Sequence, residues 1–496
     1  MAKKIAKPAI VRASDADAPS VVVRDIEFYE WPYTLRLPFR FGVITVTHGR
    51  QVVARARIET SDGKSQWGYA AEALGAKWFD KSPDISDDDN LDQLRLALEI
   101  AAAQYASHRP MSAFGHFAAA YGPQIETGAK HRLNPLVASY GPAMLDRCVL
   151  DGLGKLLKRS FYELIGKNIA GIAPQGVAPD LAGFDFPGFA AALQPLARLN
   201  VRHTVGMLDP ITAADQMNEG RVNDGLPETL EEIVATYKQR YFKLKVGGNV
   251  AKDVARLSAI AGVLDKIKGQ YHATLDGNEQ YADADGVLAL WNAIEREPRL
   301  RRLKNAILFI EQPIKRQMAA SQDVRALAEQ RAVIIDESDG DLDAFPLAKS
   351  LGYAGVSSKN CKGLYKSLIN RARCVMWNAK EGAADGQGRY FMSAEDLTTL
   401  PGICVQQDLA LVALLGLTHV ERNGHHFING MSGRPRGEQL EFLAAHPDLY
   451  VDADAMVRLK IKDGMVELGS LACPGFAVGA QPDFSAMEKM HKSRWR

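Results

Sequence analysis

Three acidic residues stand where apolar runs of the sequence stop. Asp276, Glu311 and Asp336 each follow a short β-rich run, and about one strand and one helix separate each from the next. One such acid alone is commonly a helix cap or a surface group. Three on consecutive strands would converge and repel one another unless a cation joined them. Their carboxylates are hard oxygen ligands, which makes Mg²⁺ the expected cation and Mn²⁺ the second choice.

Three lysines occupy comparable places. Lys243 and Lys245 lie one residue apart at the end of another run, so both project to the same side of a strand. Outward lysines would be an ordinary solvated pair. If helices cover the outside of the sheet, both point inward, where each cation lowers the pKa of the other. Lys359 follows a later run of this kind. Its alternative role is that of a rim residue whose side chain reaches solvent.

The elements that would position these residues predict an α/β fold. From about residue 200, short β-rich runs alternate with helical ones such as 250–267, whose apolar residues recur at helical spacing. Eight parallel strands joined by helices favour a closed (β/α) barrel of the TIM type, with catalytic groups at the carboxyl ends of its strands. The sixth strand then lies across the barrel from the second, so Lys359 can face Lys245. The predicted strands are 201–207, 241–246, 272–275, 306–310, 332–335, 355–358, 390–392 and 418–420.

The N-terminal part follows a different pattern. Residues 21–31, 42–48 and 52–59 are rich in β-branched and aromatic residues, and Ser61-Asp62-Gly63 provides a turn before the next run, 67–69. Helical patterns follow at about 90–120 and 142–164. An antiparallel sheet followed by helices indicates a separate α+β domain.

Composition excludes several classes of protein. Lys and Arg number 60 against 59 Asp and Glu, so no net charge indicates nucleic acid or an anionic membrane as a partner. Apolar runs are shorter than the roughly 18 residues that a membrane helix needs, and the basic N-terminus lacks the apolar core of a signal peptide. Five widely spaced cysteines without a CxxC pair indicate thiols in a reducing compartment, so we expect a cytoplasmic protein.

The chemical motifs occur in a specific order. Lys-x-Lys at 243–245, Asp-x-Asn at 276–278, Glu-Gln-Pro at 311–313, Asp-Glu-Ser at 336–338 and then Lys359 together resemble the enolase superfamily. The set is most similar to the muconate-lactonizing (cycloisomerase) branch. The mandelate-racemase branch places an Asp at the sixth strand and a His at the seventh, where this chain has Lys359 and the segment 393–396.

The resemblance implies a role for each matched residue. Asp276, Glu311 and Asp336 match the metal ligands, and Lys245 matches the acid/base of the second strand. Lys243 matches its partner lysine, and Lys359 matches the lysine of the sixth strand. It also implies four domains or segments: a tail at 1–20, an α+β capping domain at 21–165, the barrel at 166–440, and a segment at 441–496 that returns to the capping domain.

Further residues are candidates for substrate contact. They are Asn278, Glu395, Glu72 and Glu421, the last at the place of an acidic residue on the eighth strand of the family. Residues 67–79, with Glu72, Lys77 and Trp78, are the candidate lid. His425 and His426 have either a structural role or one at the site. The chain differs from the family after Lys359, where Asn360-Cys361-Lys362-Gly363 replaces paired glycines.

The predicted chemistry is removal of the proton next to a substrate carboxylate. The resulting enediolate is a dianion, which a cation held by three carboxylates would stabilise. A lysine with a lowered pKa would take the proton. The second lysine would return a proton in epimerisation or racemisation, or steady the intermediate in cycloisomerisation or dehydration. We expect a Mg²⁺-dependent isomerase or lyase that acts on a small-molecule carboxylate and forms a homo-oligomer.

Two alternatives remain open at this stage. Another metal-dependent barrel enzyme, such as an aldolase, would use some of the same residue types, and a Schiff-base lysine in it would be trapped by borohydride. A catalytically silent paralogue, retained as a binding or scaffold protein, would keep the fold without the reaction. Metal titration with and without a carboxylate ligand separates that protein from an enzyme.

Overall fold

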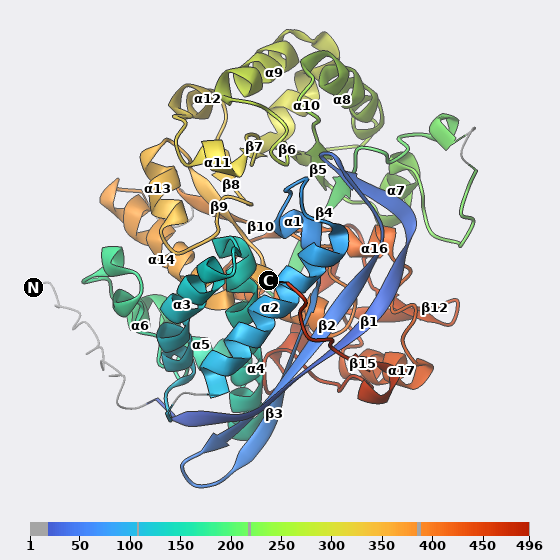
Figure 1. The fold of residues 1–496 in the computed structure, drawn as a ribbon. Coiled ribbons are helices and arrows are strands. Elements are labelled where there is room, and N and C mark those ends of the chain that lie inside the picture. Colours follow the sequence, from blue (N-terminus) through green and yellow to red (C-terminus); the bar gives the residue numbers. More distant parts are fainter. Residues whose placement is uncertain (1–17, 107–108, 217–219, 384–387, 496) are drawn as a thin grey trace, which may run out of the picture.

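The predicted barrel is present in the computed structural model, which describes residues 18–106, 109–216, 220–383 and 388–495. Within these residues, eight parallel strands form a closed ring, because β11 pairs with β4 (Figure 1). The predicted tail lies outside the described residues up to residue 17. The barrel strands are β4 (Arg198–Val205), β5 (Tyr241–Lys245), β6 (His272–Asp276), β7 (Ile307–Glu311), β8 (Val333–Ile335), β9 (Gly355–Ser358), β10 (Phe391–Ala394) and β11 (His419–Arg422).

Helices connect these strands and bury apolar side chains, and α15 (Ile403–Leu414) is buried over its whole length. In α8, Leu257, Ala261 and Leu264 are buried, and the Asn249 side chain caps the first turn by accepting from the Lys252 N–H. No helix in the described part of the chain has the length and apolar character that crossing a membrane requires. The helices of this part are α7 (Leu230–Tyr237), α8 (Val250–Leu264), α9 (Ala284–Arg296), α10 (Arg301–Ala306), α11 (Arg316–Ala319), α12 (Arg325–Gln330), α13 (Ala344–Ser350), α14 (Leu364–Lys380), α15 (Ile403–Leu414), α16 (Gly424–Phe427) and α17 (Arg436–Ala445).

The N-terminal sheet is antiparallel, as predicted, but its strands are longer. β1 (Val21–Phe41), β2 (Ile44–Thr60) and β3 (Ser65–Ala73) replace four shorter predicted runs. The prediction stopped the first strand before Pro32, which cannot donate a hydrogen bond. β1 continues through this proline because it pairs there with β2 alone; its other neighbour, β15 (Glu488–Lys489), reaches only Tyr29 and Glu30.

One predicted helix beside this sheet is broken at a proline. The predicted helix at 90–120 is two helices, α2 (Asp87–Ala106) and α3 (Ala113–Lys130), with Pro110 between them. However, α3 and α4 (Pro135–Leu157) each continue through an internal proline, Pro123 and Pro142. The helix α4 packs against β2 and β3. A Cβ atom at Gly68 of β3 would collide with the Cys148 carbonyl of α4, so this close packing requires glycine. The other N-terminal helices are α1 (Ala76–Phe79), α5 (Phe161–Gly166) and α6 (Phe186–Ala192).

The C-terminal residues contact both parts of the molecule. β14 (Met465–Glu467) pairs with β4 of the barrel, and β15 pairs with β1 of the N-terminal sheet. The Trp495 Nε1–H then donates to the His131 carbonyl just after α3, 2.8 Å away. A small hairpin of β12 (Tyr450–Ala453) and β13 (Met456–Leu459) precedes these strands. The exact limits of the domains stay a prediction.

Candidate active site

The predicted lysines and carboxylates meet at the carboxyl ends of the barrel strands. Register explains why: Lys245 lies opposite Asp276, and Asp276 lies opposite Glu311, so three neighbouring strands end at one level. Asp336 and Lys359 directly follow β8 and β9. All five residues are buried.

Lys243 lies at the centre of the acidic group. Its Nζ is 2.9 Å from oxygens of Asp276 and Glu311, 2.8 Å from Glu395 and 3.0 Å from Glu421. Burial alone would lower the pKa of Lys243, but the four carboxylates outweigh it and hold that pKa well above its usual range. The amine of Lys243 is therefore a fixed ammonium in this structure.

The expectation that neighbouring cations lower the lysine pKa is wrong for Lys243 and Lys359 in this structure. Lys359 pairs with Asp336 at 2.7 Å. Burial lowers the pKa of Lys359, but the carboxylates of Asp336, Glu421 and Glu311 together outweigh burial and the Lys243 ammonium and raise that pKa above its usual range. Attraction by the carboxylates therefore prevails over the repulsion between cations at Lys243 and Lys359.

Asp336 is held by more cations than the sequence predicted. Asp336 pairs with Lys359 and also with Lys362, whose Nζ lies 3.5 Å from Asp336 Oδ1. The same Nζ donates to Ser357 Oγ at 2.7 Å. Gln312 accepts a hydrogen bond from the Asp336 N–H at 2.9 Å. Burial raises the pKa of Asp336, but Lys359 and Lys362 bring it well below its usual value. Lys362, three residues after Lys359 in a tight turn, was the one sequence signal for this contact.

These residues form the floor of a cavity of about 410 Å³. Lys243, Lys245, Asp276, Lys359 and Glu421 line it from the barrel. Apolar and aromatic side chains of the N-terminal sheet line the opposite wall, at the end of the β1–β2 hairpin: Tyr33, Leu35, Phe39, Phe41, Ile44 and Val46.

The predicted lid is only partly at this cavity. Leu74 to Trp78 line it, and the Trp78 ring lies 4.0 Å from Lys359 Nζ. This contact places an aromatic face against the ammonium. The larger wall comes from the β1–β2 hairpin, which the sequence did not identify as part of the site, because its apolar residues are also typical of an ordinary sheet core.

Asn278 and Glu421 are two further candidates that line the cavity. Glu421 accepts from Thr204 Oγ1 at 2.6 Å and from the Asp396 N–H at 2.9 Å, besides pairing with Lys243. The Asn278 N–H donates to Asp276 Oδ1 at 2.9 Å and so orients that carboxylate.

The structure does not bring Glu395 to the cavity. Glu395 lies inside the barrel, where it pairs with Lys243 and with Arg202 of β4. Arg202 also donates to the Ala394 carbonyl at 2.8 Å and to Ser393 Oγ at 3.0 Å. Sequence reasoning missed Arg202. Its signal was alternation: Asn200, Arg202 and Thr204 are polar at every second position of a strand, and Leu199, Val201 and Val205 on its other side are apolar, with His203 as the exception.

Glu72 is also away from the cavity. It is buried between β3 and α15, where it lies 3.3 Å from the Arg147 guanidinium and accepts from the Cys404 thiol at 3.3 Å. Burial raises the pKa of Glu72 to about 7, although the Arg147 guanidinium lowers it.

Replacing Glu72 by Gln is expected to flatten the pH dependence of stability. Between pH 4.5 and about 7 the folded protein keeps a proton that the unfolded chain has lost, so the wild-type free energy of unfolding falls as pH rises through this range. Glutamine does not titrate, and the variant should gain up to about 3 kcal/mol relative to wild type between pH 5 and pH 8. Urea unfolding at both pH values measures the difference. If the free energy of unfolding changes equally with pH in the two proteins, the prediction is wrong.

The proposed metal ligands fit a hard dication by donor type. All three are carboxylates, and Lys243 Nζ lies 2.9 Å from both oxygens of Glu311 but bonds only to Oε1, which leaves Oε2 buried without a hydrogen bond. Burial, and then Glu395, Asp276 and Asp336, raise the pKa of Glu311 well above its usual value, so negative charge is in excess there. The oxygens of these three carboxylates are, however, spaced more widely than ligands around one bound metal ion. Among the described residues, the group whose ligand atoms all lie within 4.8 Å of one another is a different one.

Comparison with known proteins supports the fold. No protein-family model matches the sequence, and no curated protein matches it. Solved structures do match over nearly the whole chain. A muconate lactonizing enzyme from Mycobacterium smegmatis, complexed with muconolactone, is 18% identical, with 95% of this chain and 100% of that chain covered and a TM-score of 0.57.

Two other solved structures show the same likeness. A dipeptide epimerase from Enterococcus faecalis, complexed with Mg and the dipeptide L-Leu-L-Tyr, is 14% identical, covers 92% of this chain and 99% of its own, and has a TM-score of 0.57. An enolase from Bradyrhizobium, complexed with magnesium and mandelic acid, is 15% identical, with 95% and 99% covered and a TM-score of 0.57. The chain therefore has the fold of enolase-superfamily enzymes.

Proposed function

We propose that this protein is a divalent-cation-dependent enzyme that removes the proton next to a substrate carboxylate. The observation that carries the proposal is the placement of Lys245 and Lys359. They stand on β5 and after β9, four strands apart in the ring, and both line the same cavity. Carboxylates that can hold a cation end the strands between them.

The cation would be held by Asp276, Glu311 and Asp336. When bound, it would hold the substrate carboxylate, offset the charge that develops there, and take these three side chains from their lysine partners. Lys359 would then be a buried amine beside the Lys243 ammonium, and both effects favour its neutral form. In that form Lys359 accepts a proton from one face of the substrate, and Lys245 accepts or returns one on the other face.

The cavity wall favours a carboxylate with an apolar remainder. The β1–β2 hairpin contributes six apolar or aromatic side chains to this wall, together with the polar residues Thr34, Thr45, Thr47, His48 and Arg50, while the buried lysines and carboxylates lie on the barrel side. A substrate would therefore place its carboxylate toward the barrel and its apolar part toward the hairpin. The outcome, epimerisation or racemisation, cycloisomerisation or dehydration, depends on what the second lysine does. A homo-oligomeric assembly and a cytoplasmic location stay predictions.

Proton exchange in D₂O tests the proposal without knowledge of the product. We would screen dipeptides, N-acylamino acids and acid sugars by NMR for loss of the α-proton signal, with Mg²⁺ and after EDTA treatment. With Mg²⁺, the α-proton of at least one of these acids is expected to exchange with deuterium. This exchange should disappear with EDTA and return when Mg²⁺ is restored.

The control for this experiment is Glu311→Gln. This variant keeps the shape of the side chain and removes one proposed ligand charge, so it should require a higher Mg²⁺ concentration for the same exchange rate. Exchange that persists undiminished in EDTA, or no exchange of any acid with Mg²⁺, contradicts the proposal.

A further inference from the structure

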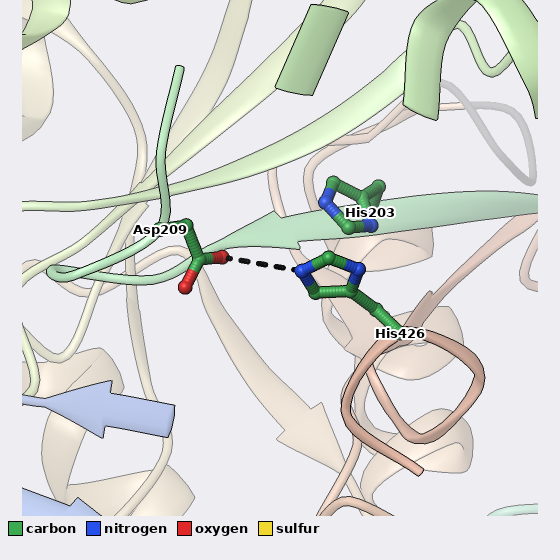
Figure 2. Close-up of side chains that lie close together, drawn as sticks. All are labelled: His203, Asp209 and His426. Carbon is green, nitrogen blue, oxygen red and sulfur yellow. Dashed lines mark ion pairs between the residues drawn. The ribbon is translucent and has the colours of Figure 1, made fainter. Parts of the chain in front are cut away.

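A second cluster of ligand-type side chains lies beside the seam where the barrel closes. It consists of His203 of β4, Asp209 in the loop after β4, and His426 of α16 (Figure 2). One ligand atom from each lies within 4.8 Å of the others, and His426 Nε2 is 4.0 Å from Asp209 Oδ2. All three are buried, at 1%, 7% and 2% exposure.

The position of His203 follows from strand alternation. Arg202 and Thr204 bond to Glu395 and Glu421 inside the barrel, so His203 between them points to the outer side. In the register of the closing pair, His203 lies opposite Arg422, four residues before His426. The cluster thus joins the first and the eighth barrel strands.

The imidazoles of this cluster have buried nitrogens without hydrogen bonds. Both ring nitrogens of His426 and Nδ1 of His203 have no hydrogen-bond partner among the described residues, and the same holds for both ring nitrogens of the neighbouring His425. A buried polar atom without a partner costs roughly 1–3 kcal/mol, and such groups in one place need an explanation. The ring of His425 stands 5.6 Å from that of His203, centre to centre.

Protonation does not provide that explanation. Burial lowers the pKa of His203 to about 3 and that of His426 well below its usual value, so both rings are neutral at pH 7. A neutral imidazole has one nitrogen with a free lone pair, which is the form that binds metals.

We propose that His203, Asp209 and His426 bind one transition-metal dication, with Zn²⁺ as the first choice. This site is separate from the carboxylate cluster of the barrel. Two imidazoles and a carboxylate are a donor set for Zn²⁺, whereas Mg²⁺ prefers oxygen alone. Ligand atoms around tetrahedral zinc are about 3.4 Å apart, since each lies about 2.0–2.1 Å from the metal. The three side chains need to move inward by only a small amount.

Contacts around the cluster hold the carboxylate in place. The Gly206 N–H donates to Asp209 Oδ2 at 2.8 Å, and Arg256 donates to the carbonyls of Gly206 and Asp209 at 2.6 and 2.9 Å. Arg36 of β1 donates to the His426 carbonyl at 2.9 Å. A metal here would therefore tie the loop after β4 to α16, beside the N-terminal sheet, and fix the closing seam next to the cavity.

Metal content measured on untagged protein tests this site. The protein is stripped with a chelator, exposed to Zn²⁺ in the presence of excess Mg²⁺, dialysed, and analysed by mass spectrometry for bound zinc. One zinc per chain is expected for wild type and for Glu311→Gln, because that variant changes only the carboxylate cluster. Cobalt in place of zinc should give a visible absorption band, since Co²⁺ at such a site absorbs and aqueous Co²⁺ scarcely does.

Variants of the cluster decide where the metal is. Asp209→Asn keeps the shape and the acceptor for Gly206, and His426→Gln removes one imidazole; each should lower zinc affinity by at least about 100-fold. His446→Gln, which replaces a buried histidine elsewhere in the chain, should bind zinc as wild type does. Wild-type protein that holds no zinc overturns the proposal, and so does unchanged zinc binding in Asp209→Asn and His426→Gln. Neither result depends on the proposed enzymatic activity.

Discussion

Lys245→Ala and Lys359→Ala should each lower turnover of the substrate found by proton exchange by about 10²–10⁴-fold, the usual contribution of a general acid or base. Neither change should unfold the protein. Asp276 keeps Lys243 at 2.9 Å, and Asp336 keeps Lys362, so no buried carboxylate loses all its cations. NMR spectra of reactions stopped at successive times give turnover and deuterium incorporation for each variant.

The pattern of exchange separates the possible reactions. In an epimerase each single variant should still exchange the α-proton of the one isomer whose proton faces the surviving lysine. In a dehydratase or cycloisomerase, exchange should depend on one lysine, and loss of the other should slow the later step.

A buried lysine outside the cavity is the control for these variants. Lys366→Met removes an ammonium that pairs with Asp339 and contacts none of the proposed metal ligands. Its turnover should remain within about tenfold of wild type. Wild-type turnover in Lys245→Ala and Lys359→Ala would show that these lysines are not the acid and base.

Arg202→Met should destabilise the protein by about 3–5 kcal/mol, the cost of removing one partner from a buried ion pair. Both side chains of the Arg202–Glu395 pair are fully buried, and the variant leaves Glu395 with Lys243 as its one cation. Urea unfolding at pH 7, followed by circular dichroism, gives the change in the free energy of unfolding.

An exposed ion pair provides the comparison for Arg202. Arg24 pairs with Glu59 at 3.0 Å, but the Arg24 side chain is 47% exposed. Arg24→Met should therefore cost about 0–1 kcal/mol. The double variant Arg202→Met with Glu395→Gln should be more stable than the sum of its single changes, because it leaves no unpaired charge. A cost below about 1 kcal/mol for Arg202→Met would contradict a stabilising role for the buried pair.

Much of the barrel could be predicted because its signals are local. A short apolar run followed by a helical pattern recurs eight times, and the carboxyl ends of parallel strands all lie on one side of a barrel. Asp276, Glu311, Asp336 and Lys359 had to meet there once the strands were correctly placed. Alternation along β5 likewise determined that Lys243 and Lys245 share a direction.

The charge state of the site could not be predicted in the same way. The sequence shows Lys243 and Lys245 side by side, and this favours mutual repulsion. Only the folded barrel brings Asp276, Glu311, Glu395 and Glu421 to within 3.0 Å of Lys243, and together these four carboxylates outweigh burial and hold its pKa above its usual range.

The sequence alone determined which residue types end each barrel strand and, through the two-residue period, which of them face inward. Tertiary structure decided which distant segments meet. The β1–β2 hairpin became a cavity wall, Glu72 became part of the interface with α15, and His203 met Asp209 and His426. These contacts depend on how the N-terminal sheet and the seam between β4 and β11 pack. Packing is a property of whole surfaces, and no local pattern in the chain records it.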